Sequence, residues 1–288
     1  MQITLHAPEL KAAVRAFARI VPSNPSLPVL GNIHVRGASG IATLTATNLD
    51  ETLSLRTEGA CAGDGEFLLP FDELKRTASA MAREDFVTIE PASERTLTLS
   101  LSLKGTGVNR TAATTPATEF PAVECLQTAG TPVSPGLFLS AFKGVARVAC
   151  TDPTRAAIAG ILVDGADGRL VATDGRRLST RRLPGLHFDG AAIVPRTRLL
   201  LNGVLDSHKE GSVGIVASGG FTRFILEAGP WQYQIRCPDL HYPNWRQVVP
   251  DDTHGVRARF TVRAEDVAQT GRLLEQVNLA RTPCVSSG

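Results

Sequence analysis

The 288-residue sequence lacks the features that mark membrane, secreted and disulfide-bonded proteins. No apolar run approaches the roughly 18 residues that a membrane-spanning helix needs, and the N-terminus lacks a signal-peptide pattern. The five cysteines are odd in number and widely scattered, and they include no C-x-x-C pair. We therefore expect a cytoplasmic protein with reduced, mostly buried thiols and no membrane partner.

Signatures of catalysis are missing as well. The six histidines show no H-E-x-x-H spacing, and the sequence has no P-loop and no G-x-S-x-G elbow. Gly105 and Gly107 form a lone G-x-G, which we interpret as a turn, and we interpret the neighbouring carboxylates Asp50 and Glu51 as solvated loop residues. The sequence thus predicts no catalytic residue, no metal and no cofactor. A repair nuclease, whose carboxylates converge on metal ions only in space, is kept as a third hypothesis.

Lysine is scarce, and arginine carries most of the positive charge of a chain whose net charge is only +2. Binding to nucleic acid therefore depends on where the charge lies. In a predicted helix over 8–20, Lys11, Arg15 and Arg19 fall at i, i+4 and i+8, away from the apolar stripe. A second predicted helix, starting at Ser134-Pro135, carries Lys143 and Arg147 outward. Such basic helix faces can contact phosphates without reading base sequence.

A long-period repeat organises the chain. The segment 44–48 ends a short strand with Ala-Thr-Asn, and the segment 170–174 ends another with Ala-Thr-Asp. Three further pairs of landmarks recur in the same order at spacings of about 122–128 residues. These pairs are Ala18-Arg19 with Ala146-Arg147, Leu69-Pro70 with Val194-Pro195, and Phe120-Pro121 with Tyr242-Pro243. A period this long indicates duplicated domains rather than a solenoid.

Each unit is predicted to contain two helices and a set of antiparallel strands, an α+β arrangement. In the first unit we expect a strand at 3–5, helices over 8–20 and 71–82, and strands at 29–36, 41–47, 52–58, 86–90 and 96–103. In the second we expect helices from 134 and over 196–207, and strands at 158–163, 169–173, 213–217, 221–228 and 231–237. A third copy begins with a strand at 260–262 and a helix over 264–279. The predicted domains are 1–124, 125–252 and the incomplete 253–288.

Five segments carry a resemblance to a known family. They are 26–32, 44–48, 171–178, 193–196 and 242–250, and they occur in the family's order across most of the chain. On these residues the chain resembles the bacterial sliding clamp, the beta subunit of DNA polymerase III. The resemblance implies tandem DNA-clamp domains, each with two helices packed on antiparallel sheets. It also implies a non-catalytic ring, its helices lining the hole, that encircles duplex DNA and tethers the replicative polymerase for processivity.

The resemblance also assigns residues to sites. Double-stranded DNA would be faced by Lys11, Arg15, Arg19, Asn24, Lys143, Arg147, Arg196 and Arg198. Short linear peptides of the DNA polymerase and the clamp loader would bind a pocket of the second domain, formed by Ile158, Thr173, Gly175, Arg176, Arg177, Leu178, Pro243, Gln247 and Val248. The contact with another copy of the chain would include Arg110 and Ala112.

Several of these positions depart from the family's pattern. Arg176 stands where the family commonly has histidine, and Gln247 where it commonly has arginine. Ala156 and Ala157 replace two tyrosines, and Asn24, Asp72 and Asp152 stand where better-known relatives have basic or amide side chains. An arginine at 110 opposes burial at an interface unless it is paired. The far wall of the pocket comes from the family's C-terminal tail, which this sequence does not contain, so we expect weaker peptide binding.

Three explanations of the short third domain stay open. The chain is a truncated clamp that does not close, or a two-domain subunit of a trimeric ring, or a divergent paralogue. The leading hypothesis is a sliding clamp that forms a dimeric or trimeric ring around DNA. Its rival is a clamp-like interaction module that binds partner peptides without encircling DNA.

Overall fold

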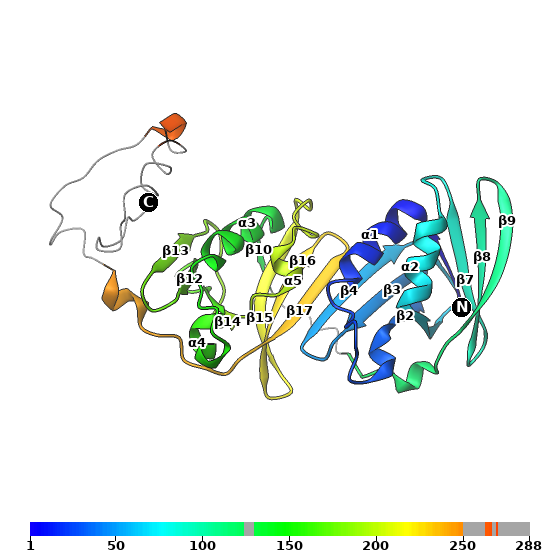
Figure 1. Cartoon of the computed structure of the whole chain (residues 1–288), viewed down its shortest axis with the longest axis horizontal. Coiled ribbons are helices and arrows are strands. Elements are labelled where there is room, and N and C mark those ends of the chain that lie inside the picture. Colours follow the sequence, from blue (N-terminus) through cyan, green and yellow to red (C-terminus); the bar gives the residue numbers. More distant parts are fainter. Residues whose placement is uncertain (124–129, 250–262, 267–268, 270–288) are drawn as a thin grey trace.

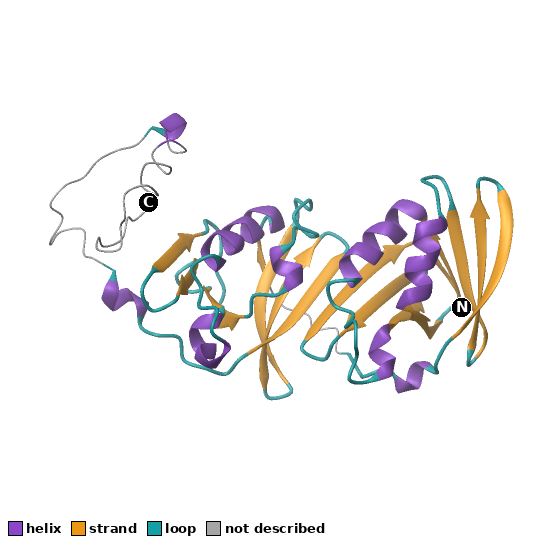
Figure 2. Cartoon of the chain, in the orientation of Figure 1, coloured by secondary structure: helices purple, strands orange, loops and turns teal. Residues whose placement is uncertain are grey.

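The computed structural model describes residues 1–123, 130–249, 263–266 and 269. Figure 1 shows the first and second halves of this described chain side by side along the long axis. Figure 2 shows that both halves are built from helices and strands. The predicted boundary at 124 and most of the predicted third domain lie outside the described residues; of the latter, Ala264–Asp266 form a 3-10 turn.

The first half begins with β1 (Gln2–His6) and α1 (Ala7–Phe17), followed by a 3-10 turn at Pro28–Gly31. Its remaining elements are β2 (Asn32–Ala38), β3 (Ile41–Thr47), β4 (Glu51–Glu58), β5 (Cys61–Ala62), β6 (Gly65–Pro70), α2 (Phe71–Ala80), β7 (Phe86–Ser93), β8 (Thr96–Leu103) and β9 (Thr106–Ala113), before a 3-10 turn at Ala117–Glu119.

The second half begins with β10 (Thr131–Pro132) and α3 (Pro135–Ala146), followed by a 3-10 turn at Pro153–Arg155. Its remaining elements are α4 (Ala156–Ala159), β11 (Ile161–Asp164), β12 (Arg169–Thr173), β13 (Leu178–Arg182), β14 (Ala191–Val194), α5 (Arg198–Leu201), β15 (Gly211–Ser218), β16 (Phe221–Ala228), β17 (Trp231–Cys237) and a 3-10 turn at Trp245–Val248.

The two halves share one strand order. The first half holds the neighbours β1-β7-β8-β9 and β4-β3-β2-β6, and the second holds β10-β15-β16-β17 and β13-β12-β11-β14. Every described pairing is antiparallel. The strand that follows the first helix, β2 in the first half and β11 in the second, therefore occupies the same place in both strand orders. This confirms the α+β fold with duplicated units that the sequence predicted.

The first helix of each half packs against a later helix of the same half. Proline occupies the first turn of both α1 and α3, where a missing N–H costs no hydrogen bond. Leu10 and Phe17 of α1, and Phe138 and Phe142 of α3, are buried as the apolar stripes predicted. Helix α1 contacts α2, and α3 contacts α5. Because the apolar stripe of each helix is buried, the basic residues on the rest of the helix surface lie on its outer side.

The halves are joined strand to strand. β17 of the second half pairs with β4 of the first, which merges two four-stranded groups into one eight-stranded sheet. At this junction the Trp231 ring meets the edge of Phe17, with 5.7 Å between centroids. Tyr233 is fully buried, and its hydroxyl donates to Glu51 Oε2 at 2.6 Å and lies 3.0 Å from Thr197 Oγ1. The junction is therefore an apolar contact with a buried polar network at its centre.

Several local predictions were wrong. The helix predicted over 8–20 ends at Phe17, although the next residues continue as turns. The helix predicted over 196–207 is reduced to α5, because Gly203 takes a left-handed backbone at φ +76°. The strand predicted at 158–163 begins only at Ile161, after the short helix α4. The predicted turn at Gly105–Gly107 is confirmed at Gly105, whereas Gly107 already belongs to β9.

Strands β5, β6, β9, β10, β13 and β14 were not predicted, since they are short or carry little apolar alternation. The solvated-loop interpretation of Glu51 was also wrong, because its carboxylate accepts a hydrogen bond from the Tyr233 hydroxyl at the junction. Among the described cysteines, Cys150 and Cys237 are buried free thiols and Cys61 is half-buried. Burial raises the pKa of the Cys237 thiol to about 12, so it remains protonated and unreactive.

Candidate functional site

The repeated Ala-Thr-Asn and Ala-Thr-Asp segments form corners after β3 and β12. In the first corner, Thr47 Oγ1 accepts the N–H of Leu49 at 3.0 Å and donates to the carbonyl of Glu51 at 2.8 Å. Asn48 Oδ1 accepts the N–H groups of Asp50 and Glu51 at 3.1 and 2.7 Å. The two side chains thus hold the backbone that leads into β4.

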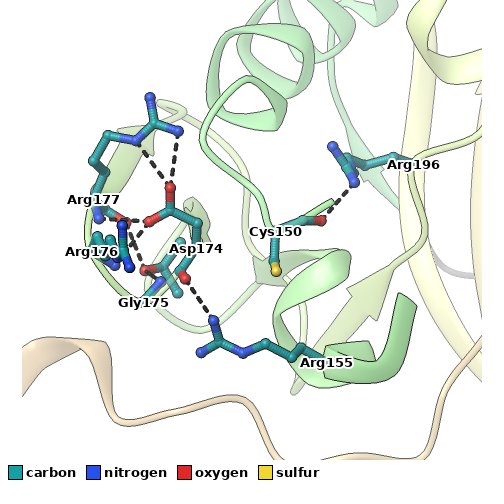
Figure 3. Close-up of polar contacts among 8 residues, drawn as sticks. Cys150, Arg155, Asp174, Gly175, Arg176, Arg177 and Arg196 are labelled. Carbon is teal, nitrogen blue, oxygen red and sulfur yellow. Dashed lines mark hydrogen bonds and ion pairs between the residues drawn. The ribbon is translucent and has the colours of Figure 1, made fainter. Parts of the chain in front are cut away.

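The second corner repeats these bonds atom for atom (Figure 3). Thr173 Oγ1 accepts the N–H of Gly175 at 3.0 Å and donates to the carbonyl of Arg177 at 2.7 Å. Asp174 Oδ1 accepts the N–H groups of Arg176 and Arg177 at 2.8 and 2.7 Å. The sequence repeat therefore marks one corner geometry that occurs twice in the chain. In both corners, the side chains of Thr and of Asn or Asp hold the backbone by hydrogen bonds.

The two corners differ in charge. In the second, the other carboxylate oxygen of Asp174 also accepts from Nε and Nη2 of Arg177, at 3.0 and 2.9 Å. The backbone N–H groups of Arg177 and Arg176, followed by the Arg177 guanidinium, lower the pKa of Asp174 to about 2. Both arginines are exposed. The corresponding residues of the first corner are Asp50 and Glu51, so a basic corner in one half matches an acidic corner in the other.

A further arginine reaches the basic corner from another segment. Arg155 Nη1 donates to the carbonyl of Asp174 at 2.9 Å, and a Cβ built on Gly175 would lie only 2.8 Å from Arg155 Nη2. The sequence did not predict this contact. Its one local signal is the cap in which Asp152 accepts the N–H of Thr154 at 2.9 Å, because that cap starts the turn carrying Arg155.

The structure brings part of the predicted peptide pocket together. The N–H of Cys150 points to the carbonyls of both Ile158 and Thr173, at 3.0 and 3.2 Å. Ile158 is buried, Thr173 and Leu178 are half-buried, and Gly175 and the two arginines after it are exposed beside them. One apolar residue and a basic rim thus adjoin, as the resemblance implied, while their binding role stays a prediction.

The other predicted wall comes from the segment after β17. Pro243, Gln247 and Val248 are exposed, and the Val248 side chain is left 68% accessible to solvent. Arg246, which the sequence did not single out, donates to Asp164 and Asp167 at 3.0 and 2.9 Å and ties this segment to the β11–β12 hairpin. These three wall residues therefore lie open to solvent on a segment that is anchored to the sheet.

The predicted DNA-facing residues fall into two groups. Arg15, Arg19, Arg147, Arg198 and Asn24 are exposed. The others are engaged: Lys11 Nζ donates to the Met81 carbonyl at 2.7 Å, and Lys143 is ion-paired with Asp206. Arg196 donates to the carbonyl of Cys150 at 2.7 Å (Figure 3). It also donates to the carbonyl of Ala159 at 3.0 Å, so it braces the backbone. The exposed arginines are thus the better placed to meet phosphates.

The predicted contact residues Arg110 and Ala112 lie on β9, the outer strand of its sheet. Arg110 Nη2 donates to Glu73 Oε1 at 2.6 Å, and Arg76 donates to the other oxygen of the same carboxylate at 2.6 Å. Glu73 is 8% exposed. Arg110 therefore has the partner that its burial would require, while its role between copies remains a prediction.

The residues of the described ranges 1–123, 130–249, 263–266 and 269 include no three His, Cys, Asp or Glu side chains that gather so as to hold a metal ion. None of the helices they form has the length and apolarity that crossing a membrane requires.

Comparison with known proteins matches this fold to one group. The beta sliding clamp of Synechococcus elongatus is 26% identical over 263 residues, which cover 87% of this chain and 68% of that protein. DNA polymerase III subunit beta from Pseudomonas aeruginosa matches with a TM-score of 0.72 at 23% identity, covering 88% of this chain and 69% of that one. The beta subunit from Streptococcus pyogenes matches with a TM-score of 0.73 at 17% identity, over 88% and 68% of the two chains. No family model matches the sequence.

Proposed function

We propose that this chain, a divergent relative of the bacterial beta sliding clamps, is itself a sliding clamp that holds a replicative polymerase on duplex DNA. The observation that carries the proposal is the edge-to-edge junction between two units of the same strand order. A junction that joins the last strand of one unit to β4 of the other is head-to-tail, and head-to-tail contacts close into rings when the rotation allows. The ring, as a dimer or a trimer, is part of the proposal.

DNA would be held by charge alone. Arg15 and Arg19 at the end of α1 and Arg147 at the end of α3 are exposed at corresponding places in the two halves. Contacts from such residues to phosphates are independent of base sequence and weaken with salt, which suits sliding. In this proposal the protein performs no catalysis, takes no cofactor and acts in the cytoplasm with the polymerase it tethers.

Partner proteins would bind at the basic corner of the second half. Short peptides of the polymerase and the clamp loader would place an apolar side chain against Ile158 and Val248, and acidic groups against Arg176 and Arg177. The exposed positions of Gly175 and the two arginines after it, beside the buried Ile158, support this assignment.

A topological assay tests the clamp. The protein is incubated with a clamp loader and nicked circular plasmid, separated from free protein on a sizing column, and the plasmid is then cut once. Retention on the circle and loss after cutting is the expected result, and equal retention on both forms contradicts it. Replacing Arg15, Arg19 and Arg147 with alanine should reduce retention on the circle, whereas replacing exposed arginines of strands and turns (Arg36, Arg95 and Arg236) should leave it unchanged.

A second candidate function is an interaction module that binds partner peptides without encircling DNA. It is favoured by Lys11 and Lys143, whose ammonium groups are already bound by Met81 and Asp206. It is also favoured by Arg110, where an interface between copies calls for an apolar side chain. Binding of polymerase peptides at normal affinity, together with no retention on circular DNA and no effect of the arginine substitutions, would support the module.

A further inference from the structure

The hairpin of β15 and β16 ends in a tight turn of defined geometry. The two strands pair over their whole length, as far as Ser218 opposite Phe221. Gly219 and Gly220 join them with left-handed φ of +57° and +77°, the conformation that suits a two-residue hairpin turn. Figure 1 shows this yellow hairpin projecting at the lower edge of the second half. The residues beside the turn are therefore held by the strand ladder at a place that a ligand can reach.

Two arginines lie opposite each other near this turn. Arg223 of β16 pairs with Arg236 of β17, so both side chains extend from the same face of the sheet. Phe221 is two residues before Arg223 and shares that face. The other face is the helix side, where Phe224 stacks on Phe138 of α3 with 5.6 Å between ring centroids. The phenylalanine and the two arginines thus lie on the face of the sheet that points away from the helices.

The arginine pair concentrates positive charge. Residues directly opposite in an antiparallel pair have Cβ atoms only about 4.5–5.5 Å apart, and like charges there destabilise the pairing. Arg236 is exposed and Arg223 is half-buried. Within the described part of the chain, neither guanidinium group forms an ion pair with a carboxylate. An anion bound between them would therefore relieve a repulsion that the described residues leave uncompensated.

Phe221 adds a flat apolar surface beside this charge. It is 40% exposed, and the guanidinium carbon of Arg236 lies 3.3 Å from the centroid of its ring. This cation–π contact holds the guanidinium group beside the ring. An apolar side chain of a peptide is usually bound in a concave site, whereas a nucleic-acid base needs only a flat ring on which to stack. The ring and the two arginines together therefore suit a planar group that is joined to phosphates.

We propose that Phe221, Arg223 and Arg236 bind single-stranded nucleic acid on the outer face of the second half. An unpaired base would stack on the open part of the Phe221 ring, and neighbouring phosphates would contact the two guanidinium groups. A duplex would gain less, because its bases are stacked on one another and cannot cover the ring. The site does not depend on the proposed clamp, since it uses no residue assigned to duplex DNA or to partner peptides.

Fluorescence anisotropy with the full-length chain tests the role of the ring. The probe is a labelled twenty-nucleotide oligothymidylate, and a labelled duplex of the same length is measured in parallel. We expect Phe221→Leu to weaken binding of the single strand at least about fivefold, because the stacked base loses its ring, and to leave duplex binding unchanged. Phe221→Tyr keeps the ring and should keep the affinity. Phe86→Leu, at another exposed phenylalanine of a strand, is the matched control and should bind as wild type does.

Salt dependence tests the role of the arginines. Arg223→Gln with Arg236→Gln should weaken binding of the single strand at least about tenfold at low salt. It should also reduce the slope of log affinity against log salt by about 1.4, because each phosphate contact to a single strand contributes about 0.7. Arg36→Gln with Arg95→Gln removes the same charge from exposed positions of the first half, and this control pair should leave both the affinity and the slope unchanged.

Several results would overturn the proposal. One is an oligonucleotide affinity that neither Phe221→Leu nor the Arg223→Gln, Arg236→Gln pair reduces, and another is an equal loss in the control pair. Equal losses for the single strand and the duplex would show that the ring adds nothing to charge. Polyglutamate that displaces the oligonucleotide at a lower concentration than unlabelled oligothymidylate would assign the site to an acidic protein. Retention of the Arg223→Gln, Arg236→Gln protein on circular DNA reports the clamp function separately, so either proposal can fail alone.

Discussion

Leu49 and Gly175 occupy the same place in the two corners and share one left-handed backbone conformation, with φ of +82° and +89°. At both places the residue's N–H donates to a threonine hydroxyl at 3.0 Å. Glycine adopts this conformation freely, whereas a leucine is strained in it. The Leu49 side chain is also 48% exposed, so burial offsets little of the strain. The first half thus keeps a corner geometry for which its sequence is poorly suited.

Replacing Leu49 with glycine should therefore stabilise the protein. Relief of the left-handed conformation should raise the free energy of unfolding by about 1–2 kcal/mol. The greater conformational freedom of glycine in the unfolded chain should lower it again by about 0.5–1 kcal/mol. We expect the free energy of unfolding in urea to rise by up to about 1.5 kcal/mol. The matched substitution Gly175→Ala should lower it by about 1–2 kcal/mol and displace Arg155. A Leu49→Gly protein less stable than wild type would show that the exposed side chain has a partner of its own.

Asp174 should make stability depend on pH in the acid range. Its pKa in the folded protein is about 2, below the ordinary value of 3.8, because the N–H groups of Arg177 and Arg176 stabilise the carboxylate. A lowered pKa means that the contribution is complete above pH 3.8 and is lost as the pH falls toward 2. Asp174→Asn should thus be less stable than wild type at pH 6, and the difference should shrink between pH 4 and pH 2. Asp239→Asn, at an exposed site, is the control; a difference that does not change with pH would exclude this linkage.

The buried hydroxyl at the junction should matter more than a peripheral one. Tyr233→Phe leaves the Glu51 carboxylate and Thr197 without their shared partner, which costs about 1–3 kcal/mol for buried polar groups. Burial, together with the nearby negative Glu51, raises the pKa of Tyr233 well above its usual value, so the phenol stays a donor. Tyr242→Phe is the matched control, because its hydroxyl bonds backbone groups, the Val171 carbonyl at 3.4 Å and Thr173, rather than a carboxylate. Equal losses in urea unfolding for the two variants would show that the network adds nothing.

Much of this fold followed from local patterns. The 3.6-residue stripes predicted α1 and α3, whose buried Leu10 and Phe138 face the core. The Ala-Thr-Asx repeat predicted the duplication that the matching strand orders confirm. Both patterns arise because neighbours in sequence share one face of an element. Element ends were less reliable, since the early end of α5 depends on the backbone at Gly203 rather than on any break in the apolar pattern.

The sites were harder to predict, because their contacts join distant segments. Lys143 and Arg147 look alike on a helical wheel, yet Asp206 lies 63 residues from Lys143 in sequence and neutralises only that one. Arg196 looks like another DNA-facing cation, but two backbone carbonyls more than 30 residues away hold it. Arg155 shows the reverse case, as its one local signal, the Asp152 cap, does not indicate that its side chain crosses to Asp174. Sequence periodicity places a charge on a face, and only the fold says whether that charge is free.

The pairing of Lys143 gives a direct test of whether charge on α3 meets DNA. Asp206→Asn should release Lys143 while keeping the shape of the side chain. Lys143 lies one helical turn before Arg147, so its freed ammonium would add a phosphate contact. Each added contact steepens the fall of log affinity with log salt by about 0.9 for duplex DNA. We expect tighter binding to a duplex at low salt and a slope steeper by about that amount, measured by anisotropy over a salt series.

Asp189→Asn is the matched control for that experiment, because it removes an exposed carboxylate of the same half without releasing a helix cation. A general loss of negative charge would strengthen binding equally in both variants. A contact made by Lys143 itself would strengthen it only in Asp206→Asn, and the double variant Asp206→Asn with Lys143→Ala would then return to the wild-type slope. A steeper slope that survives the removal of Lys143 would mean that DNA reaches the protein elsewhere, and the helix faces would lose their assigned role.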